Sequence, residues 1–271
     1  MTRRFPWQVY ATMALAIVPV LMPMDMRTPA KADNSAAVPV VVELFTSEGC
    51  SSCPPADDLL TQLASTQPVP GAKIIALGEH VDYWDHQGWR DQFGSAKFTD
   101  RQNEYAQRVF GPDQVYTPQV VVDGTEQVIG NDPARVTAAI AKAVKNPAPR
   151  VALTLTPASA GQTINVKVDA TIPEALTLKD KADVIIGITE DALSSQVQRG
   201  ENKGRELHHS AVVRTLVQAG TIPNGQRTWS GTQQLKLPTG WNASRLRVFA
   251  LVQDRATRHI VGANIAPLAS S

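Results

Sequence analysis

The sequence predicts an α/β domain over residues 38–145, followed by an all-β sandwich over residues 151–268. In the first part, apolar runs of strand length alternate with helical stripes. Residues 146–150, which begin Asn-Pro-Ala-Pro, then read as a linker, and beyond them the apolar period changes to two. A chain of 271 residues is long enough for two such domains.

The first part opens with a strand, a helix and a second strand. Residues 38–45 are a β-branched apolar run, typical of a buried strand, and residues 73–77 form another. Because proline is tolerated only in the first turn of a helix, Pro54 and Pro55 indicate a helix that begins near Cys50. Its apolar stripe consists of Ala56, Leu59, Leu60 and Leu63.

A second helix, a hairpin and a third helix complete this part. Residues 97–110 carry a helical apolar stripe. Asp123-Gly124 lies between the apolar runs 119–122 and 127–129, which is a strong indication of a β-hairpin. A helix follows up to residue 144, with Pro133 at its first position.

The second part shows short alternating strands and no helix of convincing length. Such a series of seven or eight strands is typical of a β-sandwich. The candidate strands cover residues 151–156, 163–170, 184–190, 195–199, 211–218, 229–237, 246–254 and 259–265.

The N-terminal residues have the pattern of an export signal. Arg3 and Arg4 precede a mostly apolar stretch over residues 7–24, and Ala30-Lys31-Ala32 follows as a small-x-small cleavage site. We expect cleavage after Ala32, a signal peptide over residues 1–32, and a periplasmic or secreted protein; an uncleaved anchor is the alternative. No later apolar run reaches the ~18 residues needed to span a membrane.

The chain contains only two cysteines, Cys50 and Cys53, and a pair so close in sequence cannot link distant elements. The pair is therefore expected to be chemically active or to bind a metal. At the N-terminus of a helix, unpaired N–H groups and the helix dipole favour a thiolate, the form that attacks disulfides. We expect Cys50 to be the more exposed nucleophile and Cys53 to be the resolving thiol.

Residues 40–60, read together with Thr117-Pro118, resemble the thioredoxin superfamily. The phrases Glu-Leu-Phe-Thr-Ser-Glu-Gly-Cys at 43–50 and Tyr-Thr-Pro-Gln at 116–119 are similar, more narrowly, to an uncharacterised family of secreted bacterial thioredoxin-like proteins, labelled a domain of unknown function. The resemblance implies a thioredoxin-like fold over residues 38–145 and a cis-proline at Pro118 that faces the cysteines. It implies no substrate.

The resemblance also draws attention to Glu43, since thioredoxins carry a buried acid at nearly this place that is thought to move protons for the resolving cysteine. A buried carboxylate has a raised pKa suited to proton transfer. In the alternative interpretation, Glu43 faces water or pairs with an arginine.

An aromatic and charged loop over residues 80–95 follows the second strand. Because ligands gather at the carboxyl ends of parallel strands, we expect this loop on the cysteine edge, where Trp84, Thr117 and Pro118 would bind a substrate. The loop histidines His80 and His86 also allow a copper or zinc site with the two thiolates. A hydrogen-bonded structural role is the simpler interpretation for either histidine.

A polar segment in the second part, residues 199–205 followed by Leu-His-His at 207–209, also resembles the narrower family. It would close over the cysteines or brace a domain interface, and the interface role is the one we favour.

The function that these features favour is an exported thiol–disulfide oxidoreductase that acts on protein thiols or disulfides. This interpretation requires no cofactor and no metal ion. A net charge of +1 argues against nucleic acid as a partner, and no membrane span is expected after signal cleavage. The alternatives are a copper or zinc carrier that uses the cysteines and a loop histidine, and a non-catalytic interaction protein on a thioredoxin scaffold.

Overall fold

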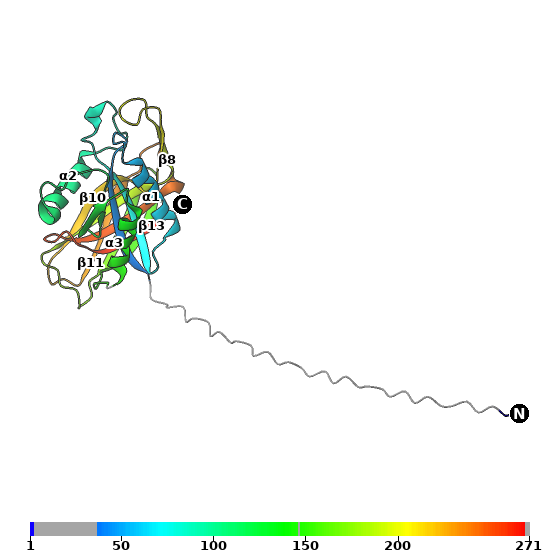
Figure 1. The fold of residues 1–271 in the computed structure, drawn as a ribbon. Coiled ribbons are helices and arrows are strands. Elements are labelled where there is room, and N and C mark those ends of the chain that lie inside the picture. Colours follow the sequence, from blue (N-terminus) through cyan, green and yellow to red (C-terminus); the bar gives the residue numbers. More distant parts are fainter. Residues whose placement is uncertain (3–36, 146, 269–271) are drawn as a thin grey trace. The chain divides into compact units, whose positions relative to one another are not determined.

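The computed structural model of the chain describes residues 1–2, 37–145 and 147–268 (Figure 1). The expected signal peptide, residues 1–32, lies outside this description apart from its first two residues. From residue 37 onward, the described residues belong to one compact unit. Within the described residues, no helix combines the length and apolar character needed to cross a bilayer.

Thirteen strands and three α-helices make up this unit. The first half contains β1 (Val38–Thr46), α1 (Pro54–Thr66), β2 (Ala72–His80), α2 (Ala96–Tyr105), β3 (Gln119–Val122), β4 (Glu126–Ile129) and α3 (Pro133–Lys145). The second half contains β5 (Ala152–Ala160), β6 (Thr163–Thr171), β7 (Ala182–Glu190), β8 (Leu193–Gln196), β9 (Glu206–His209), β10 (Val212–Ile222), β11 (Thr228–Lys236), β12 (Leu246–Asp254) and β13 (Ile260–Pro267).

One eight-stranded sheet runs through both halves, in the order β13-β12-β7-β10-β2-β1-β3-β4. Strands β1 and β2 are parallel along their whole length, from Val38 opposite Ala72 to Thr46 opposite His80. The halves meet where β10 pairs in parallel with β2, with Val212 opposite Gly78. The expected linker region therefore separates two stretches of sequence that contribute to the same sheet.

The two faces of β1 bury different layers of the first half. Residues 40, 42 and 44 pack with α1 and α3, whereas residues 41 and 45 pack with α2. Figure 1 shows α1 and α2 on opposite sides of the sheet. This alternation is the period of two that a buried strand requires, with side chains on both faces covered.

A second, three-stranded sheet with the order β11-β6-β5 packs on the part of the large sheet that comes from the second half. The core between the sheets is aliphatic and contains residues 164, 166 and 168 of β6, residues 184, 186 and 188 of β7 and residues 248, 250 and 252 of β12. All of these alternate with a period of two along their strands, as two packed sheets require.

The local predictions agree well with the observed elements. Pro54 and Pro55 lie in the first turn of α1, and the Asp123-Gly124 hairpin joins β3 to β4. The expected helix over 97–110 ends earlier, because the chain widens into a π-helical turn at Ala106–Phe110. Strand β9 was missed; it has only four residues and pairs with β8, which is equally short.

A buried ion-pair network lies on the α2 face of the sheet. The guanidinium Nε of Arg101 contacts Glu43 and lies 3.5 Å from a carboxylate oxygen of Glu79. Tyr105 donates to the second oxygen of Glu43 at 2.6 Å, and Arg101 also donates to Gln253 of β12 at 3.3 Å. Burial, and then the neighbouring Glu43 carboxylate, raise the pKa of Glu79 well above its usual value. A single cation therefore holds two buried acids and links the two halves.

We expect Arg101→Met to lower the free energy of unfolding by about 3–5 kcal/mol, because it leaves buried carboxylates without their cation. Chemical denaturation measures this loss. Arg135→Met is the matched control, since that arginine is exposed and its pair with Asp132 lies on the surface, so it should cost less than about 1 kcal/mol. Equal losses in the two variants would contradict this assignment.

Candidate functional site

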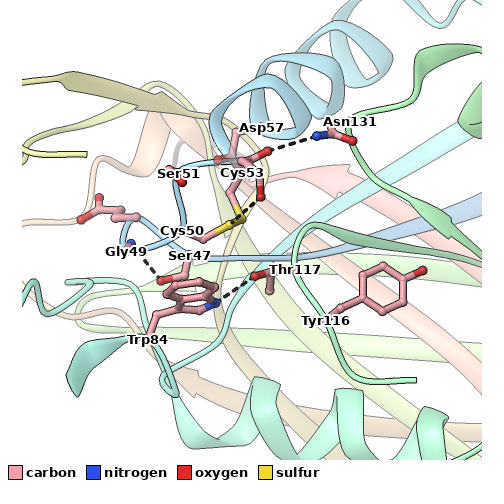
Figure 2. The surroundings of a disulfide bond; sticks show 12 residues. Ser47, Gly49, Cys50, Ser51, Cys53, Asp57, Trp84, Tyr116, Thr117 and Asn131 are labelled. Carbon is pink, nitrogen blue, oxygen red and sulfur yellow. Dashed lines mark hydrogen bonds between the residues drawn. A yellow bond between two sulfur atoms is a disulfide. The ribbon is translucent and has the colours of Figure 1, made fainter. Parts of the chain in front are cut away.

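The cysteine pair lies in the turn that joins β1 to α1 (Figure 2). The amide of Cys50 donates to the carbonyl of Ser47 at 3.1 Å, and the amide of Gly49 donates to the Ser47 hydroxyl at 3.1 Å. Cys53 is the N-cap of α1, and its carbonyl accepts the first helical hydrogen bond, from Ala56, at 2.8 Å. The two cysteines form a disulfide, with their Cα atoms 5.4 Å apart.

Both cysteines are buried, so the expectation that Cys50 is the more exposed one is wrong. Cys50 is 1% exposed and Cys53 is 0% exposed. The flanking Ser51 and Ser52 are exposed, which shows that the turn itself reaches the surface. The sulfur atoms are therefore covered by other parts of the chain rather than by depth in the core.

A loop from the second half, residues 197–205, binds the backbone of the cysteine turn. The side-chain amide of Asn202 is fully buried and donates to the carbonyls of Glu48, at 2.9 Å, and of Cys50, at 3.0 Å. The carboxylate of Glu201 accepts from the amide of Ser51 at 3.0 Å. The sequence favoured an interface role for this segment; the structure shows that it also closes over the cysteine turn.

Trp84 and Thr117, both expected near the cysteines, are brought together there. The indole N–H of Trp84 donates to the Thr117 hydroxyl at 2.8 Å, and Figure 2 shows both side chains beside the disulfide. Gly49 provides the space, because a Cβ at that position would lie 3.0 Å from the Cβ of Trp84. A side chain here would displace Trp84 from the turn.

Pro118 follows a cis peptide bond, as the thioredoxin resemblance implied. Its neighbour is Gly130, whose amide donates to the Pro118 carbonyl at 2.9 Å. A Cβ at Gly130 would lie 3.1 Å from Pro118 and 3.3 Å from Ala56, so these elements meet at van der Waals distance. Asn131, next in sequence, contacts the Ser52 carbonyl at 3.5 Å.

Glu43 belongs to the ion-pair network on the α2 face. Both of its oxygens are engaged by Arg101 and Tyr105, and its neighbours 41 and 45 on the strand pack away from α1. Of the two interpretations of Glu43, the structure shows the one in which this carboxylate pairs with an arginine, Arg101.

The histidines of the expected loop differ from one another. His86 is exposed, whereas His80 is the last residue of β2 and is 1% exposed. Both cysteines are engaged in the disulfide, so no thiolate is present to join either histidine. Among the described residues, the side chains that come together as possible metal ligands are instead Asp57, His80 and His209.

His80 is held by Asp91, also buried, whose carboxylate lies 2.7 Å from Nδ1. The same carboxylate accepts from the amides of Glu48 and Phe93, each at 2.8 Å. Burial acts to raise the pKa of Asp91, but the His80 charge and these hydrogen bonds outweigh it and lower the pKa below its usual value. Asp91 is therefore an ionised acceptor that orients the imidazole.

His209 lies on the other side of this group, with few polar partners of its own. Its Nε2 is 3.4 Å from a Glu48 oxygen and its Nδ1 is 3.8 Å from an Asp57 oxygen, and neither nitrogen makes a hydrogen bond. Burial raises the pKa of Asp57 to about 7, although the nearby His209 acts to lower it. The His80 and His209 rings meet edge to face, with centroids 4.9 Å apart.

Five residues of this region were not assigned to the site from the sequence: Glu48, Asp57, Asp91, Asn202 and His209. Asp57 could have been found, because it lies one helical turn after Cys53 and interrupts an otherwise apolar face. For Asn202 and His209 the polar segment was noticed, but the pairing of β10 with β2 that brings it to the cysteines has no local sign in the sequence.

Two solved structures resemble this chain over most of its length. A protein of Agrobacterium tumefaciens is 26% identical and has a TM-score of 0.61, and the match covers 87% of this chain and 96% of that one. The protein HBP35 of Porphyromonas gingivalis is 15% identical and has a TM-score of 0.66, with 86% and 76% of the two chains covered. The second likeness concerns the fold alone. No curated protein matches the sequence.

A family described as proteins of unknown function, DUF1223, matches residues 41–253. This range contains the cysteine turn, the Trp84–Thr117 contact, the buried histidines and the covering loop. Since the match extends over most of the sequence, the chain belongs to the DUF1223 family.

Proposed function

We propose that this protein is an exported thiol–disulfide oxidoreductase that exchanges disulfides with protein partners through Cys50 and Cys53. The observation that carries the proposal is the disulfide between these residues at the start of α1. A helix N-terminus stabilises the thiolate formed when such a bond is reduced. The chain has no other cysteine, so any thiol chemistry belongs to this pair.

The proposal includes a thioredoxin-like arrangement of residues 38–145, followed by a β-sandwich. It is supported by the order of the elements from β1 to α3 and by the parallel β1–α1–β2 unit. The packing of the loop that contains Thr117 and Pro118 beside the cysteine turn is a further support.

The exchange itself moves two electrons. In the reducing direction, the Cys50 thiolate attacks a partner disulfide, a mixed disulfide forms, and one partner thiolate leaves. The Cys53 thiolate then attacks the Cys50 sulfur, which closes the internal disulfide and releases the second partner thiolate. In the oxidising direction the same steps run backwards, and a partner dithiol becomes a disulfide.

Export to the periplasm or beyond is the setting in which we place this activity. It is supported by the basic, apolar and small-residue pattern of the N-terminal residues. It also agrees with the oxidised cysteine pair, because disulfides persist in such compartments and are rare in the cytosol.

We expect the wild-type protein to reduce insulin, or to oxidise a dithiol peptide, and Cys50→Ser to lose that activity because no mixed disulfide can form. Turbidity and thiol titration measure the two directions. Lys203→Ala, an exposed change on the covering loop, is the control and should retain activity. If Cys50→Ser matches the wild type in both assays, the proposed function fails.

A partner reaches the sulfur atoms only when the loop 197–205 moves away. We expect Asn202→Ala to speed the reduction of the disulfide by dithiothreitol about fivefold, since lost hydrogen bonds of about 1 kcal/mol in total make local opening easier. Thiol release under limiting reductant measures the rate. The neighbouring Lys203→Ala should leave it unchanged; an unaltered rate in Asn202→Ala would mean that the loop does not control access.

The burial of both cysteines favours a second candidate, a non-catalytic interaction protein with a structural disulfide. The two candidates differ in reduction potential. Structural disulfides have potentials below roughly −300 mV, whereas exchange catalysts lie at less negative values. Equilibration with glutathione or dithiothreitol buffers should give a potential above roughly −300 mV for the oxidoreductase; a lower value would support the interaction protein.

A further inference from the structure

Five polar side chains are buried together where β2 ends, beside the cysteine turn but separate from the disulfide. They come from four places in the chain: Glu48 from the turn, Asp57 from α1, His80 and Asp91 from the end of β2 and its loop, and His209 from β9. None is more than 6% exposed. Burying ionisable groups in this number is costly unless they are paired or bind a metal.

Several atoms of this cluster have no partner. Both ring nitrogens of His209 and the Oε1 of Glu48 are buried without a hydrogen bond. The other Glu48 oxygen is engaged, because it accepts from the indole N–H of Trp89 at 2.7 Å. Buried polar groups in proteins nearly always have a partner, so these atoms indicate a group that binds between them.

His80 is prepared in the way that metal-binding histidines are. Its Nδ1 is held by the Asp91 carboxylate at 2.7 Å, which leaves Nε2 for a ligand. Metal-ligating histidines commonly give their other ring nitrogen to a carboxylate in this manner, which orients the ring. Asp91 is itself fixed by the amides of Glu48 and Phe93, so the orientation of His80 is supported by the backbone.

The distances suit a small cation. One ligand atom each from Asp57, His80 and His209 all lie within 4.8 Å of one another. In a tetrahedral site with bonds of about 2.0–2.1 Å, ligand atoms are about 3.4 Å apart, so side-chain shifts of the order of 1 Å close the site. Glu48 Oε1 lies beside this group, 3.4 Å from His209 Nε2.

We propose that Asp57, His80 and His209 bind one divalent transition-metal ion, with the Glu48 carboxylate close by, and that zinc fits them best. Imidazole nitrogen and carboxylate oxygen are ordinary zinc ligands, and zinc prefers four-coordinate tetrahedral sites. Two carboxylates also neutralise a divalent cation. The site uses neither cysteine, so it differs from a cysteine–histidine metal site.

The ion would join segments that are far apart in sequence. Glu48 and Asp57 flank the cysteine turn on either side, and His209 follows the covering loop after a few residues. The Glu48 carbonyl is already bound by Asn202 of that loop. A metal at this position therefore holds the loop 197–205 against the cysteine turn.

The test titrates untagged, chelator-treated protein with zinc, its disulfide intact, by calorimetry and by metal analysis after gel filtration. We expect one zinc per chain. His80→Gln and His209→Gln, which each remove a ligand, should weaken zinc binding by at least about 100-fold. Asp91→Asn should weaken it by about 10–100-fold, because the His80 ring loses its orientation. His208→Gln is the matched control, because His208 is the exposed neighbour of His209 and should bind zinc as the wild type does.

Two readouts on the same proteins keep the test decisive if a variant folds poorly. Zinc should raise the melting temperature of the wild type and of His208→Gln but not of His209→Gln. Cobalt bound to the wild type should show tetrahedral d–d absorption without the charge-transfer band of a thiolate. The proposal is overturned if the wild type binds no zinc stoichiometrically, or if His208→Gln weakens binding as much as His209→Gln does.

Discussion

The parallel pairing of β10 with β2 is the contact on which the rest of the structure depends. It places β10 of the second half next to β2 of the first half, so that strands from both halves form a single sheet. The segment just before β10 must then lie at the end of β2, which is the edge where the cysteine turn is found. Asn202 and His209 reach that edge for this reason.

Buried charged groups have different partners on the α2 face of the sheet and at the end of β2. On the α2 face, Arg101 supplies the cation for Glu43 and Glu79, and both acids lie against it. At the end of β2, three carboxylates and two imidazoles gather with no lysine or arginine side chain bonded to them in the described residues. Both arrangements contain buried atoms without a hydrogen bond: the two carboxyl oxygens of Glu79 in the first, and both His209 nitrogens and one Glu48 oxygen in the second. Only the first has a cation of its own, since Arg101 lies against its acids.

Local sequence signals, such as turn residues and the apolar period, made much of the fold predictable. Prolines 54 and 55 located the start of α1, Asp123-Gly124 located a hairpin, and the period of two located most strands of the second half. The cysteine turn followed from the same local reasoning, whereas Trp84 was placed beside it by the rule that ligands gather at the carboxyl ends of parallel strands, and Thr117 by the thioredoxin resemblance. The buried cluster did not follow from local signals, because it is assembled by the pairing of β10 with β2, in which Val212 lies opposite Gly78, 134 residues earlier. A period of two shows which residues face a core, but it does not show which strand lies alongside. The sequence likewise contained no sign that Asn202 of the second half binds the carbonyl of the buried Cys50.

The distance in sequence between the cysteines and their cover has a consequence for biogenesis. Asn202 follows Cys50 by 152 residues. A chain that leaves the ribosome or a translocation channel from its N-terminal end therefore presents both sulfurs openly while the remainder is still being made. If the chain is exported as proposed, oxidants in the receiving compartment reach the thiols during this interval, before folding buries both sulfurs.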